Sequence, residues 1–181
     1  MKCMYWNLRG LANSLTRLAL KRLILLHKPD IILISEPWIN MDDLPRRWLH
    51  SLHLKAFAVN TRINLLPNLW CICSLHLNPV VLASDDQHVT FSITENNKTF
   101  ALSAIYAATT YLNRRKLWNS LNTLQNQHAL PWCFIGDFNA ILGAHEHRGR
   151  YVPARLPMQE FQKWTDDFNL IHLLTSGAEF T

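Results

Sequence analysis

Segment 130–139, with the sequence LPWCFIGDFN, constrains the fold of this chain more than any other stretch. The apolar run 132–135 lies between a proline and a glycine, which predicts a short, buried β-strand. If the chain turns at Gly136, then Asp137 and Asn139 are two residues apart and project toward the same side, at the C-terminal edge of a sheet. Ligands bind at that edge in open α/β sheets. The segment therefore predicts a strand that presents an acid and an amide to a ligand.

A plain turn is the alternative interpretation of the same residues. Asp and Asn that follow a strand commonly bond to nearby backbone and stabilise a turn. The ligand-binding hypothesis is favoured because an acid, a further amide and a tyrosine also come at strand ends elsewhere in the chain.

The composition predicts a single domain spanning residues 1–181. The chain has 181 residues, 49% of them apolar, which is enough for one sizeable core. Lysine and arginine outnumber aspartate and glutamate by 18 to 13, a net charge of +5 that suits a polyanionic partner. The four cysteines lie in apolar runs without a metal or redox spacing, so we expect reduced, buried thiols in an intracellular protein. The absence of long apolar runs predicts no membrane partner.

The N-terminal region predicts a strand, a helix and a second strand. Residues 2–7 form the expected first strand. From Asn13 or Ser14, both able to cap a helix, apolar side chains recur at helical spacing until a proline. The continuous apolar run 31–35 then predicts a strand that is buried on both faces. Glu36 follows directly and places a carboxylate at the strand end, where a solvent-exposed acid is the alternative.

The middle of the chain predicts an antiparallel region of short strands. Polar turn residues separate the β-rich runs, and the polar connection 95–98 predicts a hairpin. The predicted strands are 56–60, 69–75, 80–83, 89–94 and 99–106. Tyr106 ends the longest of them, either as a rim residue of the core or as a site residue.

Helices are predicted on both sides of this middle region. Asp42 and Asp43 favour the start of a short helix that runs to about His50. Periodic apolar residues predict helices 112–128 and 158–168, followed by short extended pieces at 170–174 and 180–181. Strands covered by helices in this order indicate the α/β (α+β) class.

The polar residues at strand ends define a candidate site. They comprise Asn7, Glu36, Tyr106, Asp137 and Asn139. Because the set lacks a serine or cysteine, it does not suit covalent catalysis. It suits Mg²⁺, which takes one or two carboxylates, keeps several waters and leaves room for phosphate oxygens. One carboxylate can hold the metal while another activates water, which predicts hydrolysis of a phosphate ester.

The order of these motifs resembles a known superfamily. The motifs WNxRGL at 6–11, IY at 105–106 and GDFN at 136–139, with Glu36 between the first two, are similar to those of the endonuclease/exonuclease/phosphatase superfamily, which includes deoxyribonuclease I and exonuclease III. The amino-acid sequences of segments 113–118, 136–150 and 178–181 are similar to those of the endonuclease domains of plant LINE-type (non-LTR) retroelements. The resemblance covers the whole chain in order.

The resemblance implies a two-sheet α/β sandwich flanked by helices and a Mg²⁺-dependent DNA endonuclease, with Mn²⁺ as an alternative metal. Glu36 would hold the metal with support from Asn7, and Asp137 would activate the attacking water. Tyr106 would orient the scissile phosphate or the water, and Asn139 would hold the phosphate or the attacking group.

The resemblance also predicts that the chain is C-terminally truncated. The family closes with a further strand and a Ser-Asp-His or similar motif, and no histidine of this sequence follows a Ser-Asp pair. We therefore expect weak or no activity from the chain as given, because losing one member of a cooperating catalytic set costs orders of magnitude in rate.

The expected partner is DNA, in a parent protein that would also carry a reverse-transcriptase portion, and a DNA target would imply the nucleus. Candidate nucleic-acid-binding residues are the cations Arg9, Arg114, Arg115, Arg148 and Arg150. Three rivals remain open: a non-catalytic nucleic-acid-binding remnant with strongly salt-dependent affinity, a phosphatase of the same superfamily, and a degenerate reading frame that does not fold.

Overall fold

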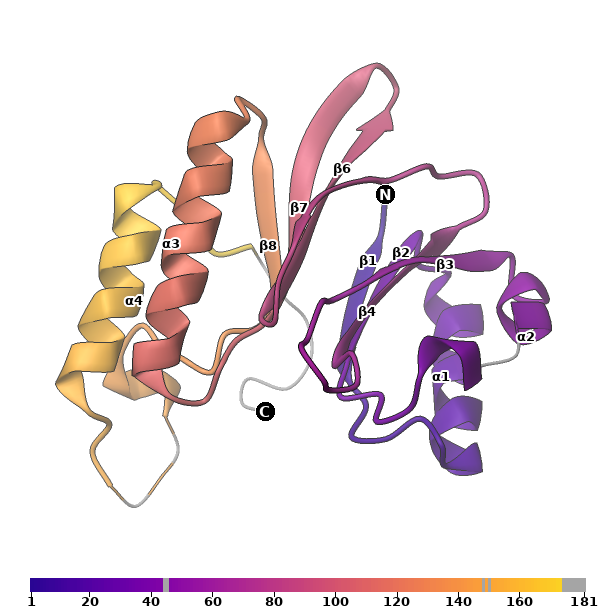
Figure 1. Ribbon diagram of the computed structural model, residues 1–181, viewed down its shortest axis with the longest axis horizontal. Helices are drawn as coiled ribbons and strands as arrows, with labels where there is room; N and C mark the ends of the chain where they lie inside the picture. The colour runs from indigo at the N-terminus through magenta and orange to yellow at the C-terminus, as the bar shows by residue number, and fades with distance from the viewer. Residues whose placement is uncertain (44–45, 148, 150, 174–181) are drawn as a thin grey trace.

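The computed structural model describes residues 1–43, 46–147, 149 and 151–173. Two four-stranded sheets face each other, with helices on the outer side of each, so the molecule has four layers (Figure 1). This is the expected two-sheet α/β sandwich flanked by helices.

The first sheet has the strand order β1-β2-β4-β3. Its strands are β1 (Cys3–Asn7), β2 (Ile31–Ser35), β3 (Leu54–Val59) and β4 (Leu69–Ser74). Strands β1 and β2 are parallel because α1 (Ser14–His27) connects them, whereas β4 runs antiparallel to both of its neighbours. The predicted strand-helix-strand start is therefore present, and Asn13 caps α1 by accepting a hydrogen bond from the Leu15 amide at 2.9 Å.

The second sheet has the strand order β5-β6-β7-β8. Its strands are β5 (Val80–Ser84), β6 (His88–Glu95), β7 (Lys98–Tyr106) and β8 (Trp132–Asp137). A two-residue turn joins β6 to β7, in which Asn96 and Asn97 have φ angles of 51° and 61°. Positive φ at both central positions matches the right-handed twist of the strands, so the predicted hairpin forms.

Burial of β2 on both faces explains its uninterrupted apolar sequence. Ile32 and Ile34 pack with Leu20 and Ile24 of α1, while Ile31 and Leu33 lie in the core between the two sheets. A strand covered on both sides needs no polar face. The strand therefore fixes the position of Glu36, the residue that follows it.

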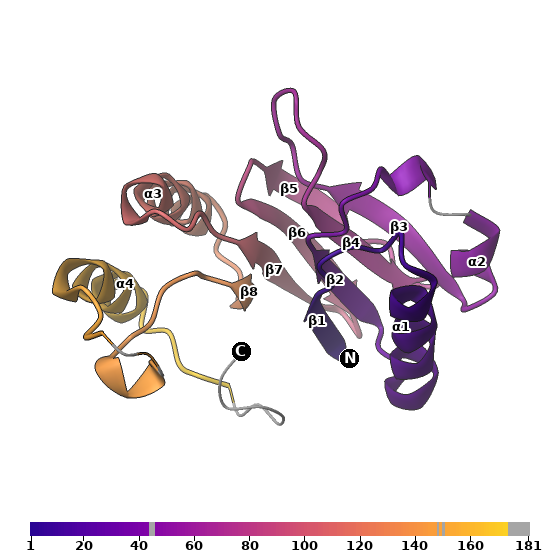
Figure 2. The same cartoon turned by 90° about the horizontal axis from the view of Figure 1, so that it is seen from below.

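The helices cover the two outer faces. The short helix α2 (Arg46–His50) lies beside α1, and α3 (Tyr111–Gln127) and α4 (Arg155–Asp167) cover the second sheet (Figure 2). Stacked aromatic rings join this last layer, with the Trp118 centroid 4.9 Å from Trp164 and 5.3 Å from Phe161. No helix within the described residues is long and apolar enough to cross a membrane.

Strand β8 differs from the sequence prediction in its burial and in the position of the turn that follows it. All of β8 is half-buried rather than buried, because β8 is the edge strand of its sheet. Gly136 does not turn the chain but continues β8, with φ at 155°, and the turn follows at Asn139, where φ is 46°. A Cβ at Gly136 would lie 1.9 Å from the Ile105 carbonyl oxygen, so glycine is needed for close strand approach.

Other boundaries also shift. Helix α4 begins at Arg155, three residues before the predicted start, because the first turn of a helix accommodates Pro157. Residues 170–173 form no strand, and positions 174 and 180–181 lie outside the described residues. A 3₁₀ turn (Met41–Asp43) and α2 occupy the predicted helix up to His50. Cys3 is exposed, unlike the buried Cys71 and Cys73.

Candidate active site

The candidate site is assembled at the C-terminal ends of two pairs of parallel strands. Asn7 is paired in register with Ser35 across β1 and β2, and Glu36 follows Ser35. Tyr106 is paired with Asp137 across β7 and β8. Parallel strands end at the same sheet edge, so each pair delivers two of the predicted residues to one place.

Glu36 joins the two sheets. Its Oε1 accepts a hydrogen bond of 2.8 Å from the Asn7 side-chain amide and one of 2.6 Å from the Tyr106 hydroxyl. Asn7 comes from the first sheet and Tyr106 from the second, so the carboxylate is held from both sides. The backbone of Glu36 has a φ of 52°, an uncommon value for a non-glycine residue. Both hydrogen bonds go to Oε1, and together they fix the direction in which the second carboxylate oxygen, Oε2, points.

Asp137 and Asn139 form a tight turn after β8. The Asn139 amide donates to Asp137 Oδ1 at 2.9 Å, and the Asn139 side chain donates to the Ala107 carbonyl at 2.7 Å. The Ala107 amide in turn donates to the Asp137 carbonyl at 2.8 Å. Asp137 Oδ1 therefore stabilises the turn, as the alternative interpretation predicts. Among the described residues, no hydrogen bond involves Asp137 Oδ2, which is left available to a ligand.

Two tyrosines of the site have raised pKa values, and the charges of both Glu36 and Asp137 contribute to each. Burial raises the pKa of Tyr106, and its hydrogen bond to Glu36 and the charges of Glu36 and Asp137 raise it further. Burial also raises the pKa of Tyr5 to about 12; the hydrogen bond with Ser35 opposes this rise, and the charges of Asp137 and Glu36 add to it. Both phenols therefore stay protonated at neutral pH, and Tyr106 remains a donor to Glu36.

Tyr5 and Ser35 belong to the site surroundings but were missed in the sequence. The Tyr5 hydroxyl donates to Ser35 Oγ at 2.8 Å. Alternation along β1 could have identified Tyr5, because residues two apart share a face of a strand and Tyr5 precedes Asn7 by two.

The donor set fits one hard cation. The Oδ1 atom of Asn7 is buried without a hydrogen-bond partner, an arrangement that costs free energy unless a ligand satisfies it. Glu36 supplies a carboxylate next to it. Among the described residues no three His, Cys, Asp or Glu side chains form a metal cluster, so a cation here would keep waters or substrate oxygens, as Mg²⁺ does.

The predicted DNA-binding arginines have different surroundings. Arg9 is exposed and follows Asn7 by two residues in the chain. Arg114 is 5% exposed, and its Nη1 donates to the carbonyls of Ala108 and Thr109, both at 2.9 Å. Arg115 is paired with Glu160, with 3.0 Å between Nε and Oε1. A DNA-binding role for these residues stays a prediction, and Arg148 and Arg150 lie outside the described residues.

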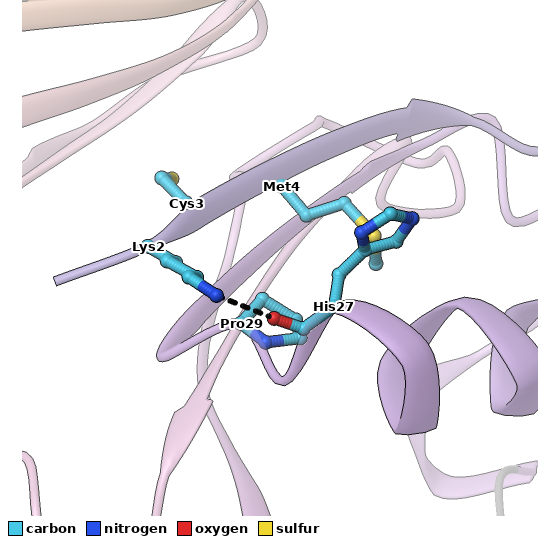
Figure 3. A pocket seen from close by; sticks show the side chains of 5 residues that line it. All are labelled: Lys2, Cys3, Met4, His27 and Pro29. Atoms are coloured by element: carbon cyan, nitrogen blue, oxygen red, sulfur yellow. Dashed lines mark hydrogen bonds between the residues drawn. The ribbon is translucent and has the colours of Figure 1, made fainter.

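The structure has one hollow near the C-terminal ends of the strands and another near the start of β1. One of about 230 Å³ borders the site through Asn139 and has Arg114 and His147 in its lining. The other, of about 310 Å³, lies at the opposite end of β1, where the Lys2 Nζ donates to the His27 carbonyl at 3.4 Å (Figure 3). Neither hollow has a carboxylate among the described residues that line it, so the candidate site is defined by the strand-end side chains around Glu36 and not by a hollow.

The sequence matches the model of the Endonuclease/Exonuclease/phosphatase family over residues 4–176. The chain belongs to this family. The match includes all five predicted site residues and nearly all of both sheets. No curated protein matches the chain.

Solved structures share the family fold at low sequence identity. The endonuclease domain of TRAS1, a telomere-specific non-LTR retrotransposon, superimposes with a TM-score of 0.70 and 16% identity over 96% of this chain and 74% of that domain. The 3'-5' exonuclease NExo from Neisseria meningitidis superimposes with a TM-score of 0.67 and 13% identity, over 92% of this chain and 71% of that protein. An AP endonuclease from Archaeoglobus fulgidus superimposes with a TM-score of 0.66 and 13% identity, over 92% of this chain and 70% of that protein.

Proposed function

We propose that this member of the Endonuclease/Exonuclease/phosphatase family is a Mg²⁺-dependent phosphodiester hydrolase that acts on DNA. One observation carries the proposal: Glu36 receives hydrogen bonds from Asn7 and Tyr106, which come from opposite sheets. A solvated structural acid would not need two donors on one oxygen, whereas a metal-holding carboxylate gains a fixed orientation from them. The non-LTR endonuclease fold of TRAS1 supports a retroelement origin.

Glu36 and Asn7 would hold the cation. The free Glu36 oxygen and the unpartnered Asn7 Oδ1 are the available ligands. A bound Mg²⁺ supplies positive charge that neutralises a phosphate oxygen. Mn²⁺ prefers the same oxygen-rich donors, so we expect it to substitute.

Asp137 would accept the proton of the attacking water. Its Oδ1 is held by the Asn139 amide, so the position of the carboxylate is fixed while Oδ2 remains available. Tyr106 keeps its proton because of its raised pKa, and its hydroxyl would exchange the hydrogen bond to Glu36 for one to a phosphate oxygen as negative charge develops. Asn139 is a positioning residue, because its side chain bonds to the Ala107 carbonyl and closes the turn.

A plasmid-nicking assay tests the proposal. We expect slow conversion of supercoiled DNA in Mg²⁺, none in EDTA, and loss of at least 100-fold in rate for Asp137→Ala. The matched control is Asp167→Ala, which removes an exposed acid paired with Lys163 at the far end of α4 and should leave nicking unchanged. Nicking that persists in Asp137→Ala would contradict the assignment.

The rival functions give different results in the same protein sample. A nucleic-acid-binding remnant would bind DNA without nicking in either metal. A phosphatase would release inorganic phosphate from a 3'-phosphorylated oligonucleotide and leave its backbone intact; one matched structure is that of a 3' phosphatase, NExo, bound to product DNA. A chain that does not fold would show no cooperative circular dichroism melt.

A further inference from the structure

An exposed tryptophan lies next to the candidate site. Trp38 follows Glu36 by two residues, and 60% of its surface is accessible. Each of the other six tryptophans is buried or half-buried. An indole left in water forgoes the stabilisation that its burial would give. Its exposure beside the catalytic carboxylate therefore suggests a ligand rather than a role in the core.

The surrounding backbone holds Trp38 in one place. The Gly10 amide donates to the Glu36 carbonyl at 2.9 Å, and the Leu11 amide donates to the Pro37 carbonyl at 2.8 Å. A Cβ on Gly10 would lie 3.0 Å from Cε3 of Trp38, so the indole edge rests against the bare glycine backbone. Gly10 has a φ of 110°, which glycine adopts at little cost. The ring is therefore supported on one side and open to solvent elsewhere.

Backbone strain is concentrated at the same place. Arg9, Glu36 and Trp38 have φ angles of 48°, 52° and 55°, in the left-handed region that side chains other than Asn and Asp rarely adopt. Such strain persists only where the surrounding structure enforces it, and it gathers at ligand-binding and catalytic positions. For Trp38 the enforced conformation keeps a large apolar ring exposed, which stability alone does not explain.

We propose that Trp38 is a stacking platform for an exposed nucleobase of the DNA strand whose phosphate lies at Glu36. This inference rests on the proposed function and names a substrate feature. An indole face stacks on any base, so the contact would be insensitive to sequence. The exposed Arg9 lies next to Gly10 and can neutralise a neighbouring phosphate. A base can reach the ring only when it is unpaired, either in single-stranded DNA or extruded from a duplex.

Binding of fluorescein-labelled oligonucleotides tests the platform without turnover. Anisotropy is measured in Ca²⁺, so that the result does not depend on cleavage, with a single strand, a blunt duplex of the same sequence, and that duplex with one unpaired base. We expect Trp38→Ala to weaken single-strand binding about 5- to 100-fold and Trp38→Phe by less than about 3-fold, since Phe retains a stacking face. Leu26→Ala, which removes an exposed apolar side chain on α1, should change nothing.

Abasic oligonucleotides separate stacking from a structural role. In a series of oligonucleotides, each lacks one base at a different position. At one position the missing base should lower the affinity of the wild-type protein but leave the affinity of Trp38→Ala unchanged. Wild-type affinity that is unaffected by every missing base would overturn the proposal, even if Trp38→Ala does not fold. Equal losses for Trp38→Ala on intact and abasic strands would overturn it as well. A positive binding result without Mg²⁺-dependent nicking would instead reject only the proposed hydrolase.

The measurements with the two duplexes show whether the stacked base comes from single-stranded DNA or is extruded from a duplex. Selective binding of the single strand over both duplexes supports an already unpaired substrate. Selective binding of the duplex with one unpaired base over the blunt duplex, with the same sensitivity to Trp38→Ala, supports capture of an extruded base. Equal binding of all three probes, each unaffected by Trp38→Ala, contradicts the platform.

Discussion

The Tyr106 hydroxyl connects two sheets through one proton. It donates at 2.6 Å to Glu36, which lies 70 residues earlier in the chain. Tyr5 offers a natural comparison, because its hydroxyl donates at 2.8 Å to Ser35, the immediate neighbour of Glu36. One phenol contacts the carboxylate of the candidate site and the other contacts a buried serine.

We predict different effects for the two Tyr→Phe substitutions. Tyr106→Phe should lower the nicking rate by at least 10-fold and the free energy of unfolding by about 1–2 kcal/mol, because a hydrogen bond to a charged group is lost. Tyr5→Phe should cost about 1 kcal/mol of unfolding free energy and leave the rate within about 3-fold. Urea melts and nicking rates measure both quantities, and an equal loss of rate in both variants would contradict the distinct role of Tyr106.

The sequence identified which residues end strands, and this was enough to bring Asn7, Glu36, Tyr106 and Asp137 together. It did not reveal the burial of Arg114. The partners of that guanidinium are the carbonyls of Ala108 and Thr109, whose directions depend on the loop between β7 and α3. Periodicity shows which residue types alternate but not where loop carbonyls point.

At the scale of elements, the close approach of β7 and β8 controls the position of Asp137. Gly136 makes the approach feasible because it has no side chain facing the Ile105 carbonyl. The same pairing places Asp137 opposite Tyr106. A displacement of β8 would therefore move the proposed base away from the phenol.

We predict that Gly136→Ala destabilises the protein by about 3 kcal/mol or more, since the new methyl group would meet backbone at 1.9 Å in a strained φ region. Gly143→Ala is the matched control. The nearest atoms to its Cβ would be those of the His145 ring, at 2.7 Å, and this exposed side chain can rotate away, so we expect a change below about 1 kcal/mol. Thermal melts of the two variants compare these costs, and similar melting temperatures would count against the close strand approach.

A partly buried polar network attaches β6 to α3. His88 Nε2 lies 3.1 Å from Asp85 Oδ2 and 2.9 Å from Ser120 Oγ, and Thr90 bonds to the other ring nitrogen at 2.9 Å. Burial tends to raise the pKa of Asp85, but hydrogen bonds from His88 and backbone amides outweigh it and lower the pKa below 3.8. The folded state therefore holds the proton of Asp85 less tightly than the unfolded state does.

This network should make stability depend on acid pH. A lowered folded-state pKa stabilises the fold fully above pH 3.8, and the contribution disappears as pH falls through the folded-state value. Asp85→Asn should therefore cost about 0.5–1 kcal/mol at pH 7, an amount limited by partial exposure, and progressively less below pH 3.8. Ser120→Ala removes a neutral partner and should give a pH-independent difference. Urea melts between pH 7 and 3 distinguish the two, and a constant difference for Asp85→Asn would refute the assignment.

Strands were predictable because β-rich runs and polar turns alternate through the middle of the chain, and the predicted strands agree with β3 to β7 within two residues. The prediction that β8 is buried was wrong because of its place in the sheet. Its apolar sequence resembles that of β2, yet β2 has a neighbour on each side and β8 has one. Strand order arises from long-range pairing, which a local pattern does not encode.

At the scale of the whole molecule, the net charge of +5 favours contact with a polyanion. We predict that the logarithm of DNA affinity falls linearly with the logarithm of salt concentration and that Arg9→Ala reduces the magnitude of the slope by about one. Arg22→Ala, an exposed cation on α1, is the control and should preserve the slope. Anisotropy titrations from 50 to 200 mM KCl, a range in which such contacts weaken strongly, provide the measurement. Equal slopes for all three proteins would exclude a phosphate contact at Arg9.

The bond between Tyr106 and Glu36 has a consequence for how this protein loses function. Neither sheet alone contains all of the candidate site residues, so the proposed hydrolysis would depend on the docking of the two sheets and not only on the presence of secondary structure. Under mild denaturant, separation of the two sheets should abolish the proposed activity while far-ultraviolet ellipticity is still native. Loss of that proposed activity would then be the earliest sign that the sandwich has opened.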